Sequence, residues 1–219
     1  MSKTIRPEDA ARAESLTVQA MEALRDARAE KALPLLEEAA HLHHPVAANQ
    51  LGALLEHGHG VAKNEARARH FYAIAADQGL ALAQFNLGFL LHMGRGGAQD
   101  LTQARNFYRK AAEKGDATAL LNLGILTARG EGGPKDVTAG YMLWERAAAK
   151  GEAMAAFNLG MVHAGGHGVP IDFVRGCYWF ETAFRLGHPQ AGMEVQKLRK
   201  VMGEEEITAV ARLHKEQQA

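Results

Sequence analysis

The chain has 219 residues, and its 25 acidic and 25 basic side chains give a formal net charge of zero. This balance argues against a nucleic-acid-binding surface that depends on the charge of the whole molecule. It does not exclude a local basic patch. The only cysteine, Cys177, excludes an intrachain disulfide framework and suits a reducing compartment.

The amino-terminal stretch MSKTIRPEDAARAESL lacks the apolar core of a secretory signal, and no stretch of the chain is apolar for long enough to span a membrane. We therefore expect a cytoplasmic protein without a membrane partner. It would be exported only if the natural start lies upstream of Met1.

Residues 7–43 are expected to form a degenerate first unit of two helices. Pro7-Glu8-Asp9 suits a first helical turn, and Ala10 to about Arg28 is predicted as one long helix. The second helix contains KALPLLEEAAHL, in which Pro34 either kinks the helix or marks its first turn.

Four clear copies of a 36-residue unit follow, at about 44–79, 80–115, 116–151 and 152–187. Each copy has an alanine four residues before the leucine of a Leu-Gly pair, and the pairs are Leu51-Gly52, Leu87-Gly88, Leu123-Gly124 and Leu159-Gly160. Each copy also closes on a glycine, at Gly79, Gly115, Gly151 or Gly187. Four registers without an insertion indicate a tandem repeat, whose stacked units bury a continuous apolar core.

Each copy is predicted to be a hairpin of two helices. In the second copy, residues 81–93 place apolar side chains at helical spacing, and Gly94-Arg95-Gly96-Gly97 ends this first helix. Gly88 lies inside the helix, where glycine costs about 1 kcal/mol relative to alanine. Because this cost recurs in all four copies, we expect a second helix to approach so closely that a Cβ atom has no room.

The second helix of each copy has its own start and stop signals. The expected N-caps are Asn64, Asp100, Asp136 and Asp172. A pair of large apolar residues follows in each copy, at Phe71-Tyr72, Phe107-Tyr108, Leu143-Trp144 and Trp179-Phe180. The closing glycine suits a left-handed helix terminus. Pro45 and Pro189, at equivalent sites, are expected in the first turn of a first helix.

Residues 188–219 are expected to cap the array and to complete a single repeat domain over residues 1–219. A fifth first helix is predicted at 189–201, with Val195-Gln196 in place of the Leu-Gly pair. A closing helix at about 204–217 begins with three glutamates, which are favourable at the positive end of a helix dipole. We expect this helix to cover the last exposed apolar face.

In register, the copies contain ANQLG…GHGVAKN, AQFNLG…GRGGAQD, ALLNLG…GEGGPKD and AAFNLG…GHGVPID. Over about residues 44–187 this pattern resembles the Sel-one-like repeat (SLR), a relative of the tetratricopeptide repeat. The resemblance implies an all-α fold, a right-handed α/α superhelix (solenoid) of stacked helical hairpins, with the first helices on the concave face. The chain departs from the family where tyrosine is frequent, at Leu55, Leu91, Thr127 and His163.

No motif indicates a catalytic, cofactor or metal site. The eleven histidines cluster in places, but spacing alone does not show ligands converging on a metal. The glycine-rich loops lack the lysine and the strand context of a phosphate-binding loop. Cys177 would be reactive only if exposed and beside a base. We therefore expect no enzyme activity, no cofactor and no metal.

The first helices carry the candidate binding residues. An amide precedes each Leu-Gly leucine, at Gln50, Asn86, Asn122 and Asn158, and either clamps a peptide backbone or bonds the neighbouring repeat. An apolar row beside it contains Ala53, Phe89, Ile125 and Met161, and is the better groove candidate. The row one turn earlier, Asn49, Phe85, Leu121 and Phe157, is expected in the core. Polar selectivity at the groove edge is expected from His92, Arg129 and His163.

The resemblance implies a protein-protein interaction scaffold or adaptor that binds a partner protein or peptide on its concave face. A bacterial toxin-neutralising immunity protein or effector-associated adaptor is the first alternative. A β-lactam-binding or β-lactam-hydrolysing enzyme is the second, although the chain lacks the paired cysteines of those relatives. The sequence does not identify the partner, the pathway or the oligomeric state.

Overall fold

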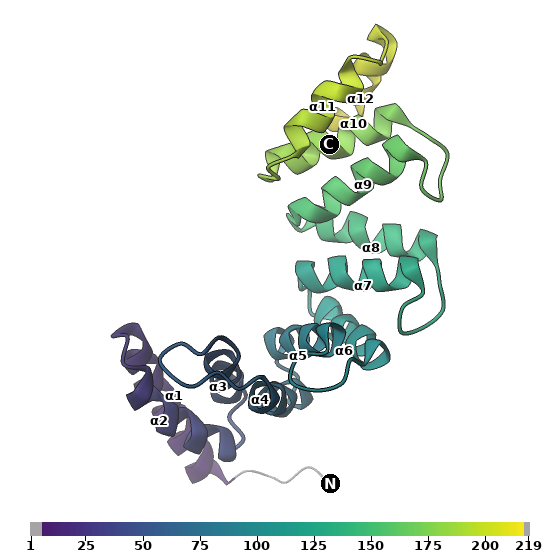
Figure 1. Cartoon of the computed structure of the whole chain (residues 1–219). Helices are drawn as coiled ribbons and strands as arrows, with labels where there is room; N and C mark the ends of the chain where they lie inside the picture. Colours follow the sequence, from purple (N-terminus) through teal and green to yellow (C-terminus); the bar gives the residue numbers. More distant parts are fainter. Residues whose placement is uncertain (1–5, 217–219) are drawn as a thin grey trace. The chain divides into compact units, whose positions relative to one another are not determined.

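The computed structural model describes residues 6–216, in which there are twelve α-helices and no strand (Figure 1). Among these residues no helix is both long and apolar enough to cross a membrane. The chain divides into two compact units, one ending at Asp116 and the other beginning at Ala117. We call them the N-terminal unit, with α1 to α6, and the C-terminal unit, with α7 to α12.

The helices of the N-terminal unit are α1 (Pro7–Arg25), α2 (Ala29–His41), α3 (Pro45–His57), α4 (Glu65–Asp77), α5 (Ala81–Met93) and α6 (Leu101–Glu113). Those of the C-terminal unit are α7 (Ala117–Arg129), α8 (Val137–Ala149), α9 (Ala153–Gly165), α10 (Phe173–Arg185), α11 (Ala191–Arg199) and α12 (Glu204–Glu216). Within each unit consecutive helices pair as hairpins, from α1–α2 to α9–α10. The predicted all-α repeat solenoid of helical hairpins is confirmed.

The glycine inside each first helix lies against an aromatic ring of the second helix. A Cβ atom built on Gly52, Gly88, Gly124 or Gly160 would come within 2.7, 3.0, 2.6 or 2.5 Å of the ring of Tyr72, Tyr108, Trp144 or Phe180, respectively. Unbonded carbon atoms do not approach so closely, because their contact optimum is about 3.5–4.0 Å. The expected close approach of the second helix is therefore confirmed, and the aromatic ring is the group that makes it.

The predicted start and stop signals of the second helices also occur in the structure. The side-chain oxygens of the four caps accept hydrogen bonds from main-chain N–H groups three residues later, at 3.0, 2.9, 2.9 and 2.8 Å for Asn64, Asp100, Asp136 and Asp172. The closing glycines have φ angles of +86°, +91°, +91° and +92°. These angles lie in the left-handed region that favours glycine.

Several predicted boundaries differ at the two ends of the chain. Helix α1 begins at Pro7 and ends at Arg25, because Ala27 adopts a left-handed conformation with a φ of +57°. Pro34 lies inside α2, and Pro45 is the first residue of α3, as predicted. Pro189 lies in the turn that precedes α11 rather than in its first turn, since that helix begins only at Ala191. Residue 217 of the predicted closing helix lies outside the described residues.

The closing helix covers only part of the last repeat. Val210 of α12 is buried in a cluster with Cys177 of α10 and Met202, which precedes α12. Phe184, near the end of α10, remains 61% exposed. The predicted cap therefore covers one face of α10, where Val210 meets Cys177 and His214 meets Glu181, and leaves Phe184 exposed.

We expect Gly160→Ala to destabilise the protein by about 1–2 kcal/mol. A Cβ 2.5 Å from the Phe180 ring should cost about 2–3 kcal/mol, the upper part of the usual range for overpacking, while helix propensity improves by about 1 kcal/mol. Urea unfolding measures this change. Adding Phe180→Leu should remove most of the penalty that is due to the contact, as a double-mutant cycle shows.

The matched control is Thr138→Ala on the exposed face of α8, where the change should stay within about 0.5 kcal/mol. If Gly160→Ala were as stable as the wild-type protein, the ring contact would not be the reason for glycine at this site.

Candidate partner-binding surface

In the N-terminal unit, one amide of the predicted row bonds the neighbouring repeat. The Asn86 side chain on α5 donates from Nδ2 to Oδ1 of Asn49 on α3 at 3.1 Å. Asn49 is only 3% exposed, so this bond links α3 to α5 at the edge of the core. Asn86 and Gln50 are both half-buried. Of the two roles considered for this row, clamping a peptide or bonding the neighbouring repeat, Asn86 has the second.

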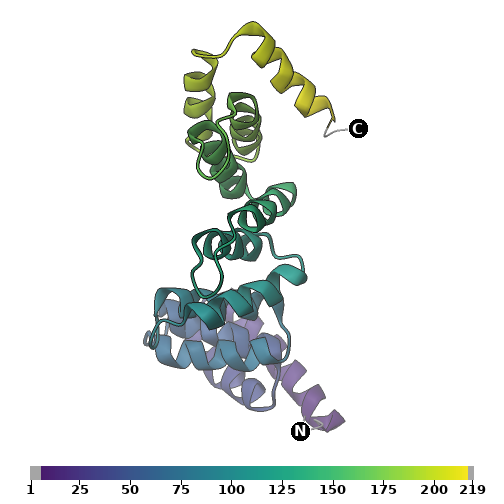
Figure 2. The ribbon, with the colours of Figure 1, turned by 90° about the vertical axis from the view of Figure 1, so that its right-hand side faces the viewer.

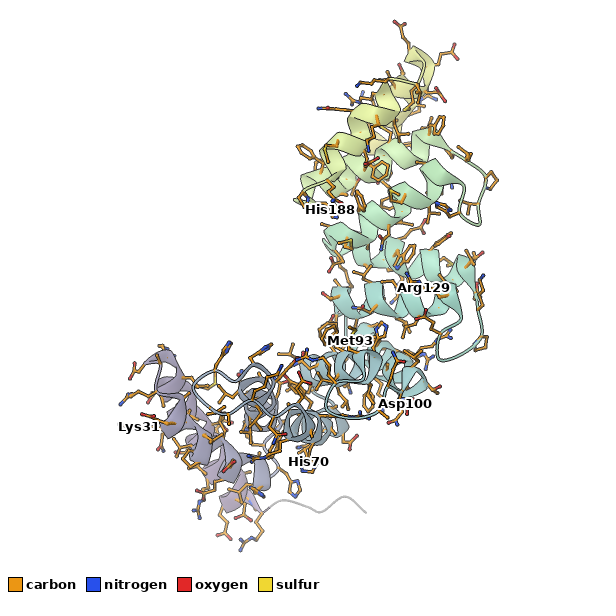
Figure 3. The ribbon with its side chains drawn as sticks, viewed as in Figure 1. Lys31, His70, Met93, Asp100, Arg129 and His188 are labelled. Atoms are coloured by element: carbon orange, nitrogen blue, oxygen red, sulfur yellow. The ribbon has the colours of Figure 1, made fainter. Side chains whose placement is uncertain are left out.

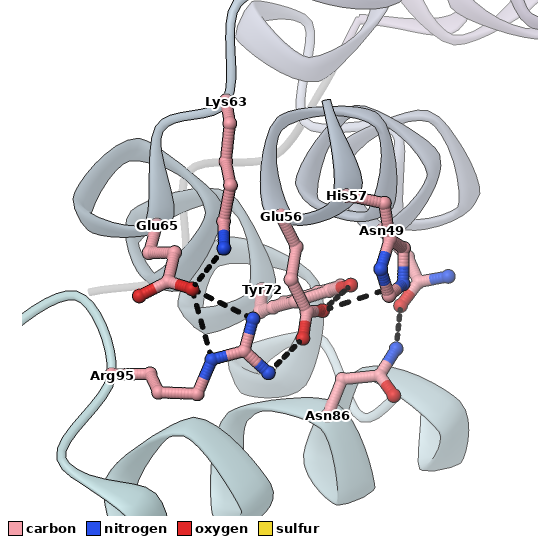
Figure 4. A network of polar contacts seen from close by, with 8 residues as sticks. All are labelled: Asn49, Glu56, His57, Lys63, Glu65, Tyr72, Asn86 and Arg95. Carbon is pink, nitrogen blue, oxygen red and sulfur yellow. Dashed lines mark hydrogen bonds and ion pairs between the residues drawn. The ribbon is translucent and has the colours of Figure 1, made fainter. Parts of the chain in front are cut away.

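A polar network that the sequence did not predict lies beside Asn86 (Figure 4). The buried carboxylate of Glu56 on α3 accepts from the hydroxyl of Tyr72 at 2.8 Å and pairs with Arg95 at 2.9 Å. Arg95, from the loop after α5, also donates twice to Glu65, at 3.0 and 2.8 Å. Lys63 pairs with the same carboxylate at 2.9 Å. The network thus ties the α3–α4 hairpin to the loop between α5 and α6.

The network shifts the pKa values of Glu65 and Arg95, and Arg95 also lies over Phe89 of the groove row. Hydrogen bonds from Lys63 and then from Arg95 hold the pKa of Glu65 below its usual value, and Glu65 in turn raises the pKa of Arg95. The Arg95 guanidinium carbon lies 5.9 Å from the centre of the half-buried Phe89 ring. No periodic signal predicts this network, because the sites equivalent to Arg95 hold His59, Glu131 and His167.

His92, also on α5, is half-buried and engaged within the hairpin. Its ring stands edge-on to Tyr108, with centroids 6.1 Å apart, and Nδ1 lies 3.4 Å from the Tyr108 hydroxyl. Gln99 donates to the main-chain oxygen of His92 at 2.6 Å. These contacts fix the imidazole at the edge of the exposed face of α5.

In the C-terminal unit the side-chain amides of the predicted row make fewer hydrogen bonds to other repeats. Asn122 on α7 donates to the main-chain oxygen of Thr118 in its own helix at 2.9 Å, which leaves its carbonyl oxygen to accept. Asn158 on α9 is half-buried and has no hydrogen-bond partner among the described residues. Ile125 is half-buried, and Met161 is 43% exposed.

The two polar edge residues of this unit differ sharply in burial. The side chain of Arg129, labelled in Figure 3, is 68% exposed, and its one ion pair with the described residues is a long one, to Glu131 at 3.8 Å. His163 is 9% exposed, and desolvation lowers its pKa. His163 therefore lies in the core rather than at the surface. The position of His163 in the repeat could have predicted its burial, since the equivalent residues Leu55, Leu91 and Thr127 are also buried.

The two rows expected on the first helices differ in exposure. No member of the groove row of Ala53, Phe89, Ile125 and Met161 is buried. In the row expected in the core, Asn49 and Leu121 are buried. Phe85 and Phe157 of that row are half-buried and pack on second-helix rings, with centroids 5.9 Å from Tyr108 and 5.4 Å from Phe180.

Among the described residues no group of three histidine, cysteine or acidic side chains could hold a metal ion. Cys177 is 1% exposed, and its thiol donates to Glu181 at 3.6 Å. Burial, with the nearby Glu181 carboxylate, raises the pKa of the Cys177 thiol to about 11. The thiolate that a nucleophile requires is therefore scarce at neutral pH.

We expect the thiol of the folded protein to react with Ellman's reagent at pH 8 at least 100-fold more slowly than the thiol of the urea-unfolded chain, because the thiol is both protonated and covered. Absorbance at 412 nm follows the reaction. Equal rates in the two states would show that α12 does not protect Cys177.

Arg95→Met should destabilise the protein by about 1–3 kcal/mol, because the buried Glu56 loses its cationic partner while the partly exposed arginine limits the effect. Urea unfolding measures the loss. The substitution should also raise the pKa of Glu65 toward its usual value, which an NMR titration follows. Because the folded pKa of Glu65 is depressed, its contribution to stability is present above the unfolded pKa and is lost as the pH falls through the folded value.

The matched control is Arg67→Met, whose ion pair with Glu37 is exposed and worth about 0–1 kcal/mol. Adding Glu56→Gln to Arg95→Met should recover part of the stability, since a neutral amide can still accept from Tyr72. Equal effects of the Arg95 and Arg67 substitutions would contradict a structural role for the network.

Solved structures of similar proteins share this architecture. A Sel1 repeat protein from Oxalobacter formigenes is 32% identical, with 82% of this chain and 74% of that chain covered and a TM-score of 0.73. The protective antigen c5321 of uropathogenic Escherichia coli, described with an SLR fold, is 24% identical, with 92% and 52% covered and a TM-score of 0.55. An immunity protein from Pseudomonas aeruginosa is 18% identical, with 98% and 84% covered and a TM-score of 0.50, a likeness of fold alone.

No curated protein matches the sequence. The family model of the Sel1 repeat matches residues 45–80, 81–116, 117–152 and 153–188. These four segments are the four copies seen in the sequence, each with bounds one residue later, and together they cover about two thirds of the chain. The chain belongs to the Sel1 repeat family.

Proposed function

We propose that the chain is a protein-interaction scaffold whose first helices bind a partner protein or peptide through their partly exposed faces. Sel1 repeat proteins are generally scaffolds of this kind. The observation that supports the proposal here is the contrast between neighbouring positions of one helix. On α9, Leu159 is fully buried while Met161, two residues later, is 43% exposed. An apolar residue at this position recurs in each repeat and is never buried.

The C-terminal unit offers the more complete set of partner contacts. Asn158 has both a donor and an acceptor without a partner among the described residues, and Asn122 retains its carbonyl oxygen. Main-chain amides of an extended peptide or a helix end present the complementary groups. Ile125 and Met161 add apolar surface, and methionine adapts its shape to different partners. Arg129 adds a cation in solvent at the carboxyl end of α7.

The N-terminal unit would contribute Gln50, Phe89 and His92. Its amide Asn86 already bonds Asn49, so its share of polar contacts is smaller. The same surfaces would serve a toxin-neutralising immunity protein, in which case the partner is a toxin. No observation on this chain favours that narrower role over a general scaffold.

A photoreactive amino acid placed at residue 161 or at residue 142 tests which face meets the partner. Met161 on α9 and Met142 on α8 are both exposed methionines of the C-terminal unit, at 43% and 59%, but they lie on a first and a second helix. We expect crosslinks to one partner from residue 161 in cells of the native host and none to that partner from residue 142. Crosslinks only from residue 142 would overturn the proposal.

The double variant Asn122→Ala/Ile125→Ala should weaken binding of the crosslinked partner at least about tenfold, since interface anchors cost more than about 1 kcal/mol each when truncated. Its thermal unfolding should stay near that of the wild-type protein, because both side chains are only half-buried. Calorimetric titration measures the affinity. The control Thr138→Ala/Met142→Ala should bind like the wild-type protein, and undiminished binding by the first variant would contradict the proposal.

A further inference from the structure

Helix α11 lacks the second helix that completes every Sel1 repeat. Its Val195 and Gln196 stand at the positions of the Leu-Gly pair, which is buried in all four repeats. Here Val195 is half-buried and Gln196 is exposed. Val195 packs against the cluster of Cys177, Met202 and Val210, so the side of α11 that a second helix would cover is covered only in part.

Helix α12 does not fill this place because it packs on α10 instead. Only residues 200–203 connect α11 to α12, whereas residues 166–172 connect α9 to α10. Figure 2 shows α12 leaving α11 at an angle rather than folding back along it. Val210 then meets Cys177 of α10, and His214 reaches Glu181 and Arg185, while the ring of Phe184 stays exposed.

A groove of about 640 Å³ lies beside Phe184, lined from α10, α11 and α12 by Glu181, Phe184, Arg185, Gly192, Val195, Gln196, Arg199 and His214. The exposed ring of Phe184 lies over Gly192, where an added Cβ would come within 3.2 Å of the ring. Phe184 and Val195 give the groove an apolar floor. A volume of this size suits a ligand of two or three residues rather than a whole helix.

The polar wall of the groove carries a surplus of positive charge. Glu181 is already paired with Arg199 at 2.6 Å and with Nε2 of His214 at 2.8 Å. Arg185 donates to Thr182 at 3.2 Å and lies 2.9 Å from Nδ1 of His214, and it has no carboxylate partner among the described residues. A guanidinium without an anion beside an apolar floor is complementary to a carboxylate attached to an apolar group.

We propose that this groove binds a short peptide segment that presents an apolar side chain next to a carboxylate. The carboxylate pairs with Arg185, and the apolar side chain packs on Phe184 and Val195. The carboxylate is that of a chain terminus, because a groove for two or three residues holds a chain end better than a segment that continues on both sides. This site is separate from the surface proposed above on α7 and α9, so one scaffold has two places to hold partners.

Three dipeptide probes test the site on the full chain by ¹⁵N NMR titration. N-acetyl-Leu-Phe carries a terminal carboxylate, N-acetyl-Leu-Phe-amide is its neutral match, and N-acetyl-Phe-Asp-amide carries an acidic side chain. We expect the amide signals of Phe184, Gly192 and Val195 to shift with the first probe and its neutral match to bind at least about tenfold more weakly. The third probe tests a side-chain carboxylate in place of the terminal one. Binding of the first probe supports the site, and binding of the third probe alone would overturn the proposal.

Substitutions in the groove separate recognition of the carboxylate from nonspecific apolar binding. Arg185→Gln should weaken binding of the acidic probe about tenfold without changing binding of the neutral one, and Arg185→Lys should retain part of the difference. Phe184→Ala should weaken both. Arg175→Gln, an exposed arginine of the same helix that pairs with Asp172, is the control and should change neither.

Equal affinities for the acidic and neutral probes would overturn the proposal, as would no binding at 10 mM or shifts confined to α7 and α9. Equal effects of Arg185→Gln and Arg175→Gln would do the same. Because none of these measurements involves the partner of α7 and α9, the two proposals stand or fall separately.

Discussion

The contact between a helix glycine and an aromatic ring is the constraint on which the repeats depend. Gly160 admits the ring of Phe180 to a distance that any Cβ atom would block, and the other three copies repeat the contact. The glycine sacrifices about 1 kcal/mol of helix propensity at each site. In return the two helices of a hairpin have one fixed approach, which sets the rotation of the first helix about its axis. That rotation buries Leu159 and turns Met161 outward, so the packing of the core determines which residues are available to a partner.

Features that depend on local sequence were predictable, because each has a short-range physical cause. The hairpins, the aspartate and asparagine caps and the left-handed glycines all recur with the 36-residue period. The network around Arg95 could not be predicted, since it joins residues from two repeats and the equivalent positions in other copies differ in charge. The position of α12 could not be predicted either, because it depends on a short connection and on the fit of Val210 against Cys177. The burial of His163 could have been predicted, because its equivalent positions in the first two copies are leucines, Leu55 and Leu91.

The two units use the same repeat differently. In the N-terminal unit the amide of Asn86 and the network of Glu56, Tyr72 and Arg95 bind one repeat to the next. Polar atoms that already bond within the array in this way are not available to bond a partner. In the C-terminal unit Asn158 is unpaired among the described residues, and the groove beside α11 leaves Arg185 without an anion. We therefore propose that the N-terminal unit contributes more to the stability of the array and that the C-terminal unit recognises partners.

Hydrogen-deuterium exchange of the full chain, with and without the crosslinked partner, tests the central claim most directly. Amide exchange in a helix slows where a partner covers it and suppresses local opening. The account predicts added protection in α7 and α9, with α8 unchanged because its ring-bearing face already packs inward on α7. Protection of α8 with none in α7 and α9 would contradict a scaffold that binds through its first helices.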